Sequence, residues 1–301
     1  MANLRDVRLR MRAIKQTLQV TKAMNLISTA KLRKGRRMLE DTEPYFTRIQ
    51  KSMFDILSGA SRLQSEFFRM FNSDRASAND RAYTAIIAIT SDKGLAGGYN
   101  ANIFRQVNDL CTKVKNPVLI LIGAVGNRYF EHTPYVVLEN YTFRSQLPTL
   151  EHAEEIAQYI ISQYLWGIFD EVHVVYTHMY STIKLLPAKQ QIFPLSAEKI
   201  QAELSDKGNM KRVELKFEFL PSEGDVFDAL VPLYIRGILY GCMVEAYVSE
   251  QSARMAAMDE ASKNANEMLA SLQITYNRAR QAGITQEISE IVGGSTALNK
   301  G

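Results

Sequence analysis

The feature that most constrains the fold is a stretch of strong helix formers that fills residues 222–298. After Pro232 it contains no proline, and between Gly241 and Gly293 its only glycine is Gly283. Because proline and glycine are the residues that interrupt helices, this composition predicts one long helix, which Pro232 could either start or bend slightly. About 75 residues at roughly 1.5 Å each give a helix on the order of 110 Å long. Such a helix needs a partner along its side, since propensity alone does not hold it.

The expected partner is the other end of the chain. Residues 3–57 contain no proline before Pro44 and one glycine, Gly35. Within them, apolar and small polar residues recur at alternating spacings of three and four, which is the pattern of a heptad seam with a polar middle. The seam consists of Leu4, Val7, Met11, Ile14, Leu18, Thr21, Asn25, Ser28 and Leu32.

The C-terminal stretch offers a facing set of small and flexible residues. Small side chains let two helix backbones approach closely, and methionine fills irregular gaps. Terminal helices separated by a compact domain must pair antiparallel, so we expect a long antiparallel coiled coil with a globular insertion. The facing set is Met258, Ala261, Ala265, Met268, Leu272, Ala279 and Gly283.

The insertion has the pattern of an α/β domain. Buried strands are expected at 82–90 and 117–122, and further strands at 135–141, 171–178, 184–194 and 213–220, of which one of the last two would lie at an edge of the sheet. Helices are expected at 100–114 and 151–165. Strands that alternate with helices predict a mostly parallel, Rossmann-like sheet. The expected domains are an N-terminal helix at 1–60, an inserted α/β domain at 75–220 and a C-terminal helix at 222–298, with a linker at 58–80.

Residues 229–248 are apolar enough to raise the question of a membrane span. Gly237 and Gly241 even have the spacing of a membrane GxxxG motif. However, Arg236 and Glu245 lie inside this stretch, and each would cost about 2.5–3.5 kcal/mol near the centre of a bilayer. The pattern favours a helix buried on all sides where the coiled coil meets the inserted domain.

The charge of the chain is distributed unevenly. Residues 1–37 hold eleven Lys or Arg and one acid, Asp6, a net charge of +10, so the remaining residues carry −6 of the total of +4. A basic helix of this kind can bind nucleic acid, anionic lipid or an acidic protein, or can simply be solvated. No aromatic residue precedes Tyr45, which argues against stacking on bases.

A glycine-rich loop at 91–100 lies between an expected strand and an expected helix, the place where many α/β proteins bind phosphate. The loop fits neither GxGxxG nor GxxxxGK[ST], and Gly123 and Gly126 after the next strand are equally incomplete. Tight turns that need glycine are the simpler interpretation. The alternative is a cytosolic nucleotide-binding α/β protein with a coiled-coil dimerisation arm.

Catalytic and metal-ligand patterns are missing from the sequence. The four histidines, at 132, 152, 173 and 178, have no metal-ligand spacing, and no nucleophile motif is present. His173 and His178 are five residues apart on one expected strand and therefore point to opposite faces. Cys111 and Cys242 are too few for a disulfide scaffold and suit a reducing compartment. We expect no catalytic site, no cofactor and no metal.

Residues 284–298 are largely apolar although they end a long helix. An apolar helix end is either frayed or surrounded by an apolar collar. A long helix with such an end and a basic flank would suit insertion into a hole.

Three segments of the sequence resemble one family. Residues 21–34, TKAMNLISTAKLRK, resemble the N-terminal signature of the γ subunit of F-type ATP synthase, and residues 276–294 resemble its C-terminal signature. The loop at 91–100 is similar to the glycine loop of the family, with Ala96 where many members carry cysteine. The resemblance therefore spans the chain.

The resemblance implies a rotor. The antiparallel helices would be the central shaft in a ring of three α and three β subunits, and the inserted domain would lie beside the ε subunit and against the c-ring of Fo. The complex would be peripheral on the cytoplasmic face of a bacterial cell membrane. The family's pattern places the contacts with the α/β ring at Lys22, Ala23, Met24, Arg278, Gln286, Glu287 and Ile288.

Overall fold

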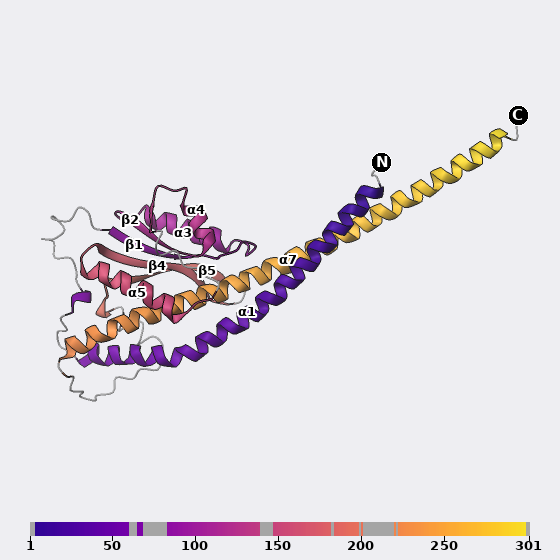
Figure 1. The fold of residues 1–301 in the computed structure, drawn as a ribbon. Coiled ribbons are helices and arrows are strands. Elements are labelled where there is room, and N and C mark those ends of the chain that lie inside the picture. Colours follow the sequence, from indigo (N-terminus) through magenta and orange to yellow (C-terminus); the bar gives the residue numbers. More distant parts are fainter. Residues whose placement is uncertain are drawn as a thin grey trace. The chain divides into compact units, whose positions relative to one another are not determined.

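The computed structural model describes residues 4–59, 65–68, 83–138, 147–181, 184–198, 200, 220 and 222–298. Two long helices, α1 (Leu4–Gly59) and α7 (Glu223–Leu298), enclose the other elements in sequence (Figure 1). Between them lie η1 (Glu66–Phe68), β1 (Tyr83–Ile89), α3 (Tyr99–Cys111), β2 (Pro117–Ile122), α4 (Ala124–Phe130), β3 (Val136–Val137), α5 (Leu150–Leu165), β4 (Phe169–Met179) and β5 (Leu185–Phe193). The chain forms two compact units, one of residues 1–29 with 254–301 and one of residues 30–253.

In the first unit, α1 and α7 pair antiparallel through the predicted seam. From Leu4 to Ser28 every predicted seam position of α1 is buried or half-buried. The two helices keep one register, because the contact pairs Arg8–Tyr276 and Thr21–Ser262 have residue numbers that add up to 284 and 283. The spacing of the N-terminal helix therefore predicted its packing correctly.

Two members of the predicted facing set on α7 are wrong. Met268 is 58% exposed, whereas its neighbour Leu269 is half-buried. Between Ala265 and Leu272 the heptad can step by three and then four or by four and then three, and the sequence alone does not decide between them. Gly283 lies beyond the last half-buried residue, Ala279, and a Cβ there would meet nothing within 4 Å.

The second unit contains a five-stranded sheet in the order β3-β2-β1-β4-β5. The first four strands are parallel, and β5 pairs antiparallel with β4 at one edge. Strands alternate with helices in the sequence, as predicted, because crossover connections are what join parallel strands. The mostly parallel sheet with long terminal helices confirms the predicted fold class.

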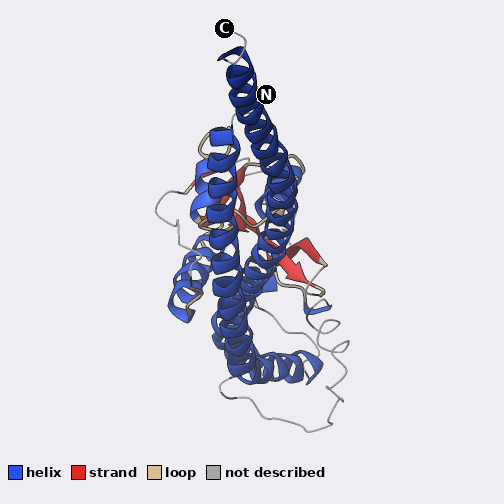
Figure 2. Ribbon diagram, turned by 90° about the vertical axis from the view of Figure 1, so that its right-hand side faces the viewer, coloured by secondary structure: helices blue, strands red, loops and turns tan. Residues whose placement is uncertain are grey.

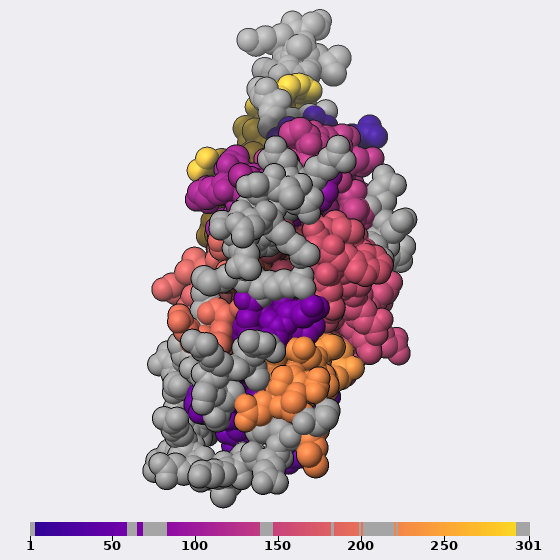
Figure 3. All heavy atoms as spheres, turned by 90° about the vertical axis from the view of Figure 1, so that its left-hand side faces the viewer, coloured from indigo at the N-terminus to yellow at the C-terminus, as the bar shows by residue number. Residues whose placement is uncertain are grey.

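Helices cover both faces of this sheet (Figure 2). One core contains side chains of α5, the C-terminal half of α1 and the adjoining part of α7. A smaller core packs α3 and α4 on the opposite face through Ile103, Val107 and Phe130. The short helix η1 lies against the first turns of α7, where the rings of Phe68 and Phe227 are 4.9 Å apart (Figure 3).

Most of the stretch 229–248 of α7 packs into the larger core. By length and composition α7 passes as a candidate membrane span, the one such helix in the described residues. However, both of its internal charges have partners inside the protein. Arg236 pairs with Glu154 at 3.3 Å, and Glu245 lies 2.5 Å from His178. This supports the prediction of a core helix.

Several local predictions require correction. Gly123 needs glycine geometry as expected, since its φ is 102° and a Cβ there would lie 2.2 Å from the Thr90 carbonyl oxygen, but the turn expected around Gly126 is instead a short helix, α4. Pro232 does not start α7, which begins at Glu223. The third strand covers only Val136–Val137 of the expected 135–141, whose last three residues lie outside the described residues, as does the strand expected at 213–220 except for Leu220.

Candidate partner-binding surface

The coiled coil of the first unit has a polar middle. Thr21 Oγ1 and Ser262 Oγ are 2.8 Å apart, and Asn25 Nδ2 donates to the backbone oxygen of Met255 at 3.2 Å. Thr21 and Ser28 are buried. Polar groups buried in a seam must pair, so this layer fixes the register of the two helices but adds less apolar burial than leucine would.

Beyond this pairing, α7 continues alone within the described residues. Every described side chain from Gln281 to Val292 is exposed. Ile284, Ile288 and Ile291 are 47%, 56% and 71% exposed and follow one another at spacings of four and three, so they form a stripe on one helix face. We call Ile284, Ile288, Ile291 and Val292 the terminal stripe.

A second apolar surface lies on the outside of α1. Val20, Leu26 and Ile27 are 57%, 72% and 57% exposed, and exposed Ala23 lies between them on the helix. These residues are outside the heptad seam, so they do not contribute to the coiled coil. Contiguous exposed apolar residues of this kind mark interaction surfaces.

The predicted partner-binding residues fall on these two surfaces or beside them. Lys22 and Ala23 are exposed and Met24 is half-buried on α1, while Arg278, Gln286, Glu287 and Ile288 are exposed on α7. Ile288 belongs to the terminal stripe, and Gln286 lies on the opposite side, where its Nε2 donates to Glu290 Oε1 at 3.1 Å. The prediction did not include Val20, Leu26, Ile27 and Ile291, which lie on the same two surfaces. The sequence could have identified these residues, since all four are apolar and lie outside the heptad seam.

The glycine loop is tied to its own flanks. Asn100 accepts from the Ser91 backbone N–H at 3.0 Å and donates to Ser91 Oγ at 2.7 Å, and Ser91 Oγ donates to the Lys93 carbonyl at 2.8 Å. Gly126 N–H donates to Thr90 Oγ1 at 3.1 Å, and a Cβ on Gly126 would come within 2.5 Å of that oxygen. The absence of a side chain at Gly126 thus allows α4 to pack closely against Thr90 at the end of β1.

Helix α7 occupies the end of the sheet where nucleotides bind in other α/β proteins. Tyr99, the first residue of α3, donates its hydroxyl to the Ala246 carbonyl at 3.2 Å, and Ser249 Oγ donates to the Thr177 carbonyl at 3.0 Å. These contacts lie at the carboxyl ends of the strands, where the order of the sheet reverses. They argue against the nucleotide-binding alternative.

Histidines and cysteines of the described residues serve the packing. His173 is 4% exposed and pairs with Glu171 at 2.9 Å, whereas His178 pairs with Glu245 on the other face of β4. The described residues contain no group of three or more His, Cys, Asp or Glu placed to hold a metal ion. Cys111 and Cys242 are free and buried.

Comparison with known proteins identifies the family. The ATP synthase family model matches residues 3–298. The ATP synthase gamma chain of Acetivibrio thermocellus is 40% identical over 99% of this chain and 100% of its own length, and that of Ruminiclostridium cellulolyticum is 42% identical over 98% and 99%. A gamma chain of Acetobacterium woodii, named sodium ion specific, is 36% identical over 99% of both chains.

Solved structures show the same fold. A chain from the mitochondrial ATP synthase of Euglena gracilis has a TM-score of 0.62 at 18% identity and is matched over 98% of this chain and 94% of its own. A chain from the central stalk and c-ring of the Tetrahymena thermophila enzyme has a TM-score of 0.53 at 21% identity, over 81% and 99%. The full-length sequence match and this shared fold together establish that the chain belongs to the ATP synthase gamma chain family.

Proposed function

We propose that this chain is the central-stalk rotor subunit of a proton-translocating F1Fo ATP synthase, with no catalytic site of its own. In this role it couples rotation of the c-ring to successive conformational changes at the β subunits and regulates ATPase activity and proton flow. The observation that carries the proposal is the row of exposed isoleucines, Ile284, Ile288 and Ile291, near the end of α7 in a chain of this family. A ring of three α and three β subunits would enclose this end.

The partner contacts proposed from the family pattern use both surfaces of the first unit. On α1 they are Lys22, Ala23 and Met24, next to the exposed Val20 and Ile27. On α7 they are Arg278, Gln286, Glu287 and Ile288. Basic and amide groups supply directed hydrogen bonds. The apolar residues supply accessible surface that is removed from water on binding.

Asymmetry allows such a helix pair to act on three identical subunits in turn. Two helices of different sequence present a different surface to each subunit, and a contact that favours one conformation shifts its population. Moving a site from 1:99 to 99:1 takes about 5.5 kcal/mol of differential interaction. An isoleucine that is buried against a β subunit in only one of its two conformations contributes about 1.5–3 kcal/mol of this difference, so a few residues of the terminal stripe suffice.

The remaining proposals concern organisation and location. We propose that 1–60 and 222–298 act as the rotor helices and that 75–220 forms the inserted domain, which contacts the ε subunit and the c-ring. The complex would lie on the cytoplasmic face of a bacterial cell membrane.

Since a relative is named sodium ion specific, the coupling ion needs its own test. In membrane vesicles, ATP synthesis that a protonophore abolishes and a sodium ionophore leaves intact would support protons, and the opposite result would contradict them.

Rotation of the assembled complex is the direct test. The chain is assembled with its α and β subunits, the ring is fixed to glass, and a bead is attached to the inserted domain. With ATP, we expect rotation in one direction with three stops per revolution. An assembled complex that hydrolyses ATP while the bead stays still would contradict the rotor role, as would failure of the chain to assemble with α and β.

A further inference from the structure

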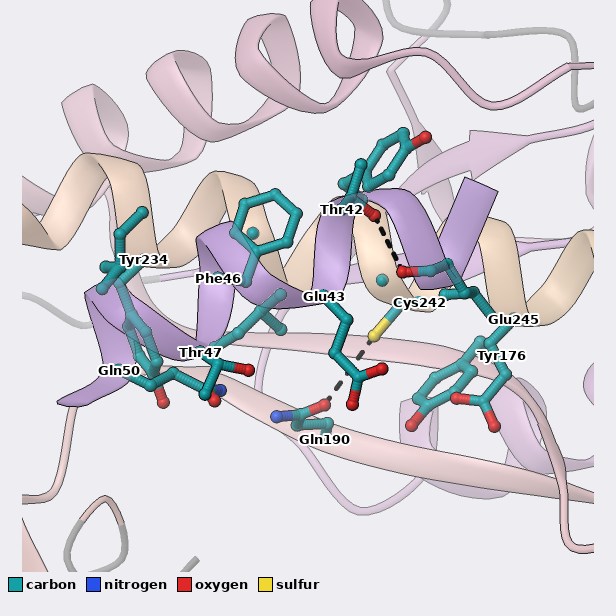
Figure 4. Close-up of a pocket in the computed structure, with 16 residues that line it drawn as sticks. Thr42, Glu43, Phe46, Thr47, Gln50, Tyr176, Gln190, Tyr234, Cys242 and Glu245 are labelled. Carbon is teal, nitrogen blue, oxygen red and sulfur yellow. Dashed lines mark hydrogen bonds between the residues drawn. The ribbon is translucent and has the colours of Figure 1, made fainter. Parts of the chain in front are cut away.

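A groove of about 760 Å³ opens in the second unit, where the C-terminal half of α1, the middle of α7 and the strands β4 and β5 meet (Figure 4). Every described residue that lines it belongs to this unit. Its volume lies within the range of about 300–1,000 Å³ that is typical of small-molecule sites. None of the residues proposed to contact the α/β ring lines it.

The described lining of the groove contains acidic side chains and no basic ones. Two carboxylates line it, Glu43 from α1 and Glu245 from α7, while none of the described lining residues is Lys, Arg or His. Glu245 is held in place, since the Met179 backbone N–H donates to its Oε1 at 3.1 Å and His178 Nδ1 lies 2.5 Å away. Burial raises the pKa of Glu245, so a positive charge entering the groove would stabilise its ionised form.

Aromatic rings form much of the wall. Phe46, Tyr176, Tyr234 and Tyr240 all line the groove, and the ring centroids of Phe46 and Tyr240 are 6.1 Å apart. Aromatic faces attract cations, most strongly where water is partly excluded. They also give an apolar ligand a surface on which to pack.

Unfilled space adjoins these groups. Gly237, Gly241 and Glu245 follow one another every four residues on α7 and therefore share the helix face that lines the groove. A Cβ on Gly241 would meet nothing within 4 Å. In Figure 4 the Glu43 side chain extends from α1 toward Gln190 of β5, opposite this helix face.

We propose that this groove binds an amphipathic organic cation, an ammonium group attached to an apolar body. The ammonium group lies near Glu43 and Glu245 with the aromatic rings around it, and the apolar body packs along Leu39 and Ile238. An anion of the same shape would face two carboxylates, and a neutral molecule would gain only the apolar contact. This site is independent of the rotor role, because it rests on the groove alone.

Binding to the full-length chain is measured by titration calorimetry with benzyltrimethylammonium. Neopentylbenzene has the same shape without the charge, and benzenesulfonate has the opposite charge. We expect the cation to bind at least about tenfold more tightly than the neutral molecule, and the anion to show no binding. Equal affinity of the cation and the neutral molecule would overturn the proposal, as would the absence of cation binding.

Two variants locate the site. Gly241→Leu places a side chain in the open space and should abolish binding, whereas Gly283→Leu, on an exposed part of the same helix, should leave the affinity unchanged. Glu43→Gln removes one exposed carboxylate and should weaken cation binding severalfold without changing the unfolding midpoint. Unchanged affinity in Gly241→Leu, with the fold verified by its unfolding midpoint, would contradict the assignment.

Discussion

At the scale of single residues, two glycines four positions apart on α7 have opposite surroundings. A Cβ on Gly237 would lie 2.3 Å from Cδ1 of Phe46, while a Cβ on Gly241 would meet nothing. Gly35 of α1 is similarly close to α7, since its Cβ would lie 2.6 Å from Cγ2 of Val248. Glycine at 35 and 237 thus lets the helices approach, whereas glycine at 241 leaves space.

This difference predicts opposite effects of the same substitution. Gly241→Ala should stabilise the chain by about 0.5–1 kcal/mol, because alanine is the better helix former. Gly237→Ala should destabilise it by about 1–3 kcal/mol, because the added methyl group would overlap the Phe46 ring and force it away from α7. Urea unfolding of both variants measures the change, and equal stabilisation by the two substitutions would contradict the close approach.

The buried thiols predict loss of stability at alkaline pH. Burial raises the pKa of Cys111 from 9.0 to about 11, and burial also raises the pKa of Cys242. A raised pKa means that the folded chain holds the proton more tightly than the unfolded chain. The stabilisation is therefore complete below about pH 9 and is lost as the pH rises through about 11, at roughly 1.4 kcal/mol per pH unit and thiol.

Urea unfolding between pH 8 and pH 11 tests this prediction. Cys111→Val is the matched control, because it keeps a small apolar side chain and removes the titrating group. The variant should lose less stability over this range than the original chain. Identical pH profiles would show that Cys111 does not titrate differently in the folded state.

At the scale of elements, the polar layer of the coiled coil should couple α1 to α7. The hydrogen bond between Thr21 and Ser262 spans 241 residues of sequence. A double-mutant cycle with Thr21→Val and Ser262→Ala should give a coupling of about 0.5–1.5 kcal/mol. Thr17 is a control, since its hydroxyl donates only to the Ala13 carbonyl on its own helix, and Thr17→Val should show no coupling to Ser262→Ala.

The sequence predicted the long elements best. The seam of α1 and the strands β1 and β2 follow directly from periodicity and from uninterrupted apolar runs, because those signals extend over many residues. Helix α4 was missed because it has only seven residues and carries Gly126. Gly126 donates its backbone N–H to the Thr90 hydroxyl. This contact depends on the tertiary fold, so no local sequence pattern predicts it.

The candidate site was only partly predictable for a related reason. Ile288 and Glu287 came from the resemblance to a family, because both side chains are exposed in the described structure and belong to no packing pattern of the chain. Val20 and Ile27 could have been found as apolar residues outside the seam. Which of these side chains meet a partner depends on the partner's surface, which the sequence of this chain does not contain.

At the scale of the whole molecule, the terminal stripe should matter for the complex and not for the fold. Ile284→Lys with Ile288→Lys should leave the free energy of unfolding of the isolated chain within about 0.5 kcal/mol of the original, because both side chains are exposed. In the rotating complex the same change should lower the torque, since charges would replace apolar contacts. Ile284→Val with Ile288→Val is the control. Unchanged torque in the lysine variant would rule out the terminal stripe as a surface that contacts the α/β ring during rotation.

The register of the two long helices also determines when they can pair during synthesis. Arg8 contacts Tyr276, which is 268 residues further along the chain, so the first helix to leave the ribosome receives its partner last. Throughout synthesis the apolar seam of α1 stays uncovered, and closing so large a loop is slow. Nascent chains with an uncovered apolar helix are prone to aggregate, and this arrangement makes them natural clients for chaperones until translation ends.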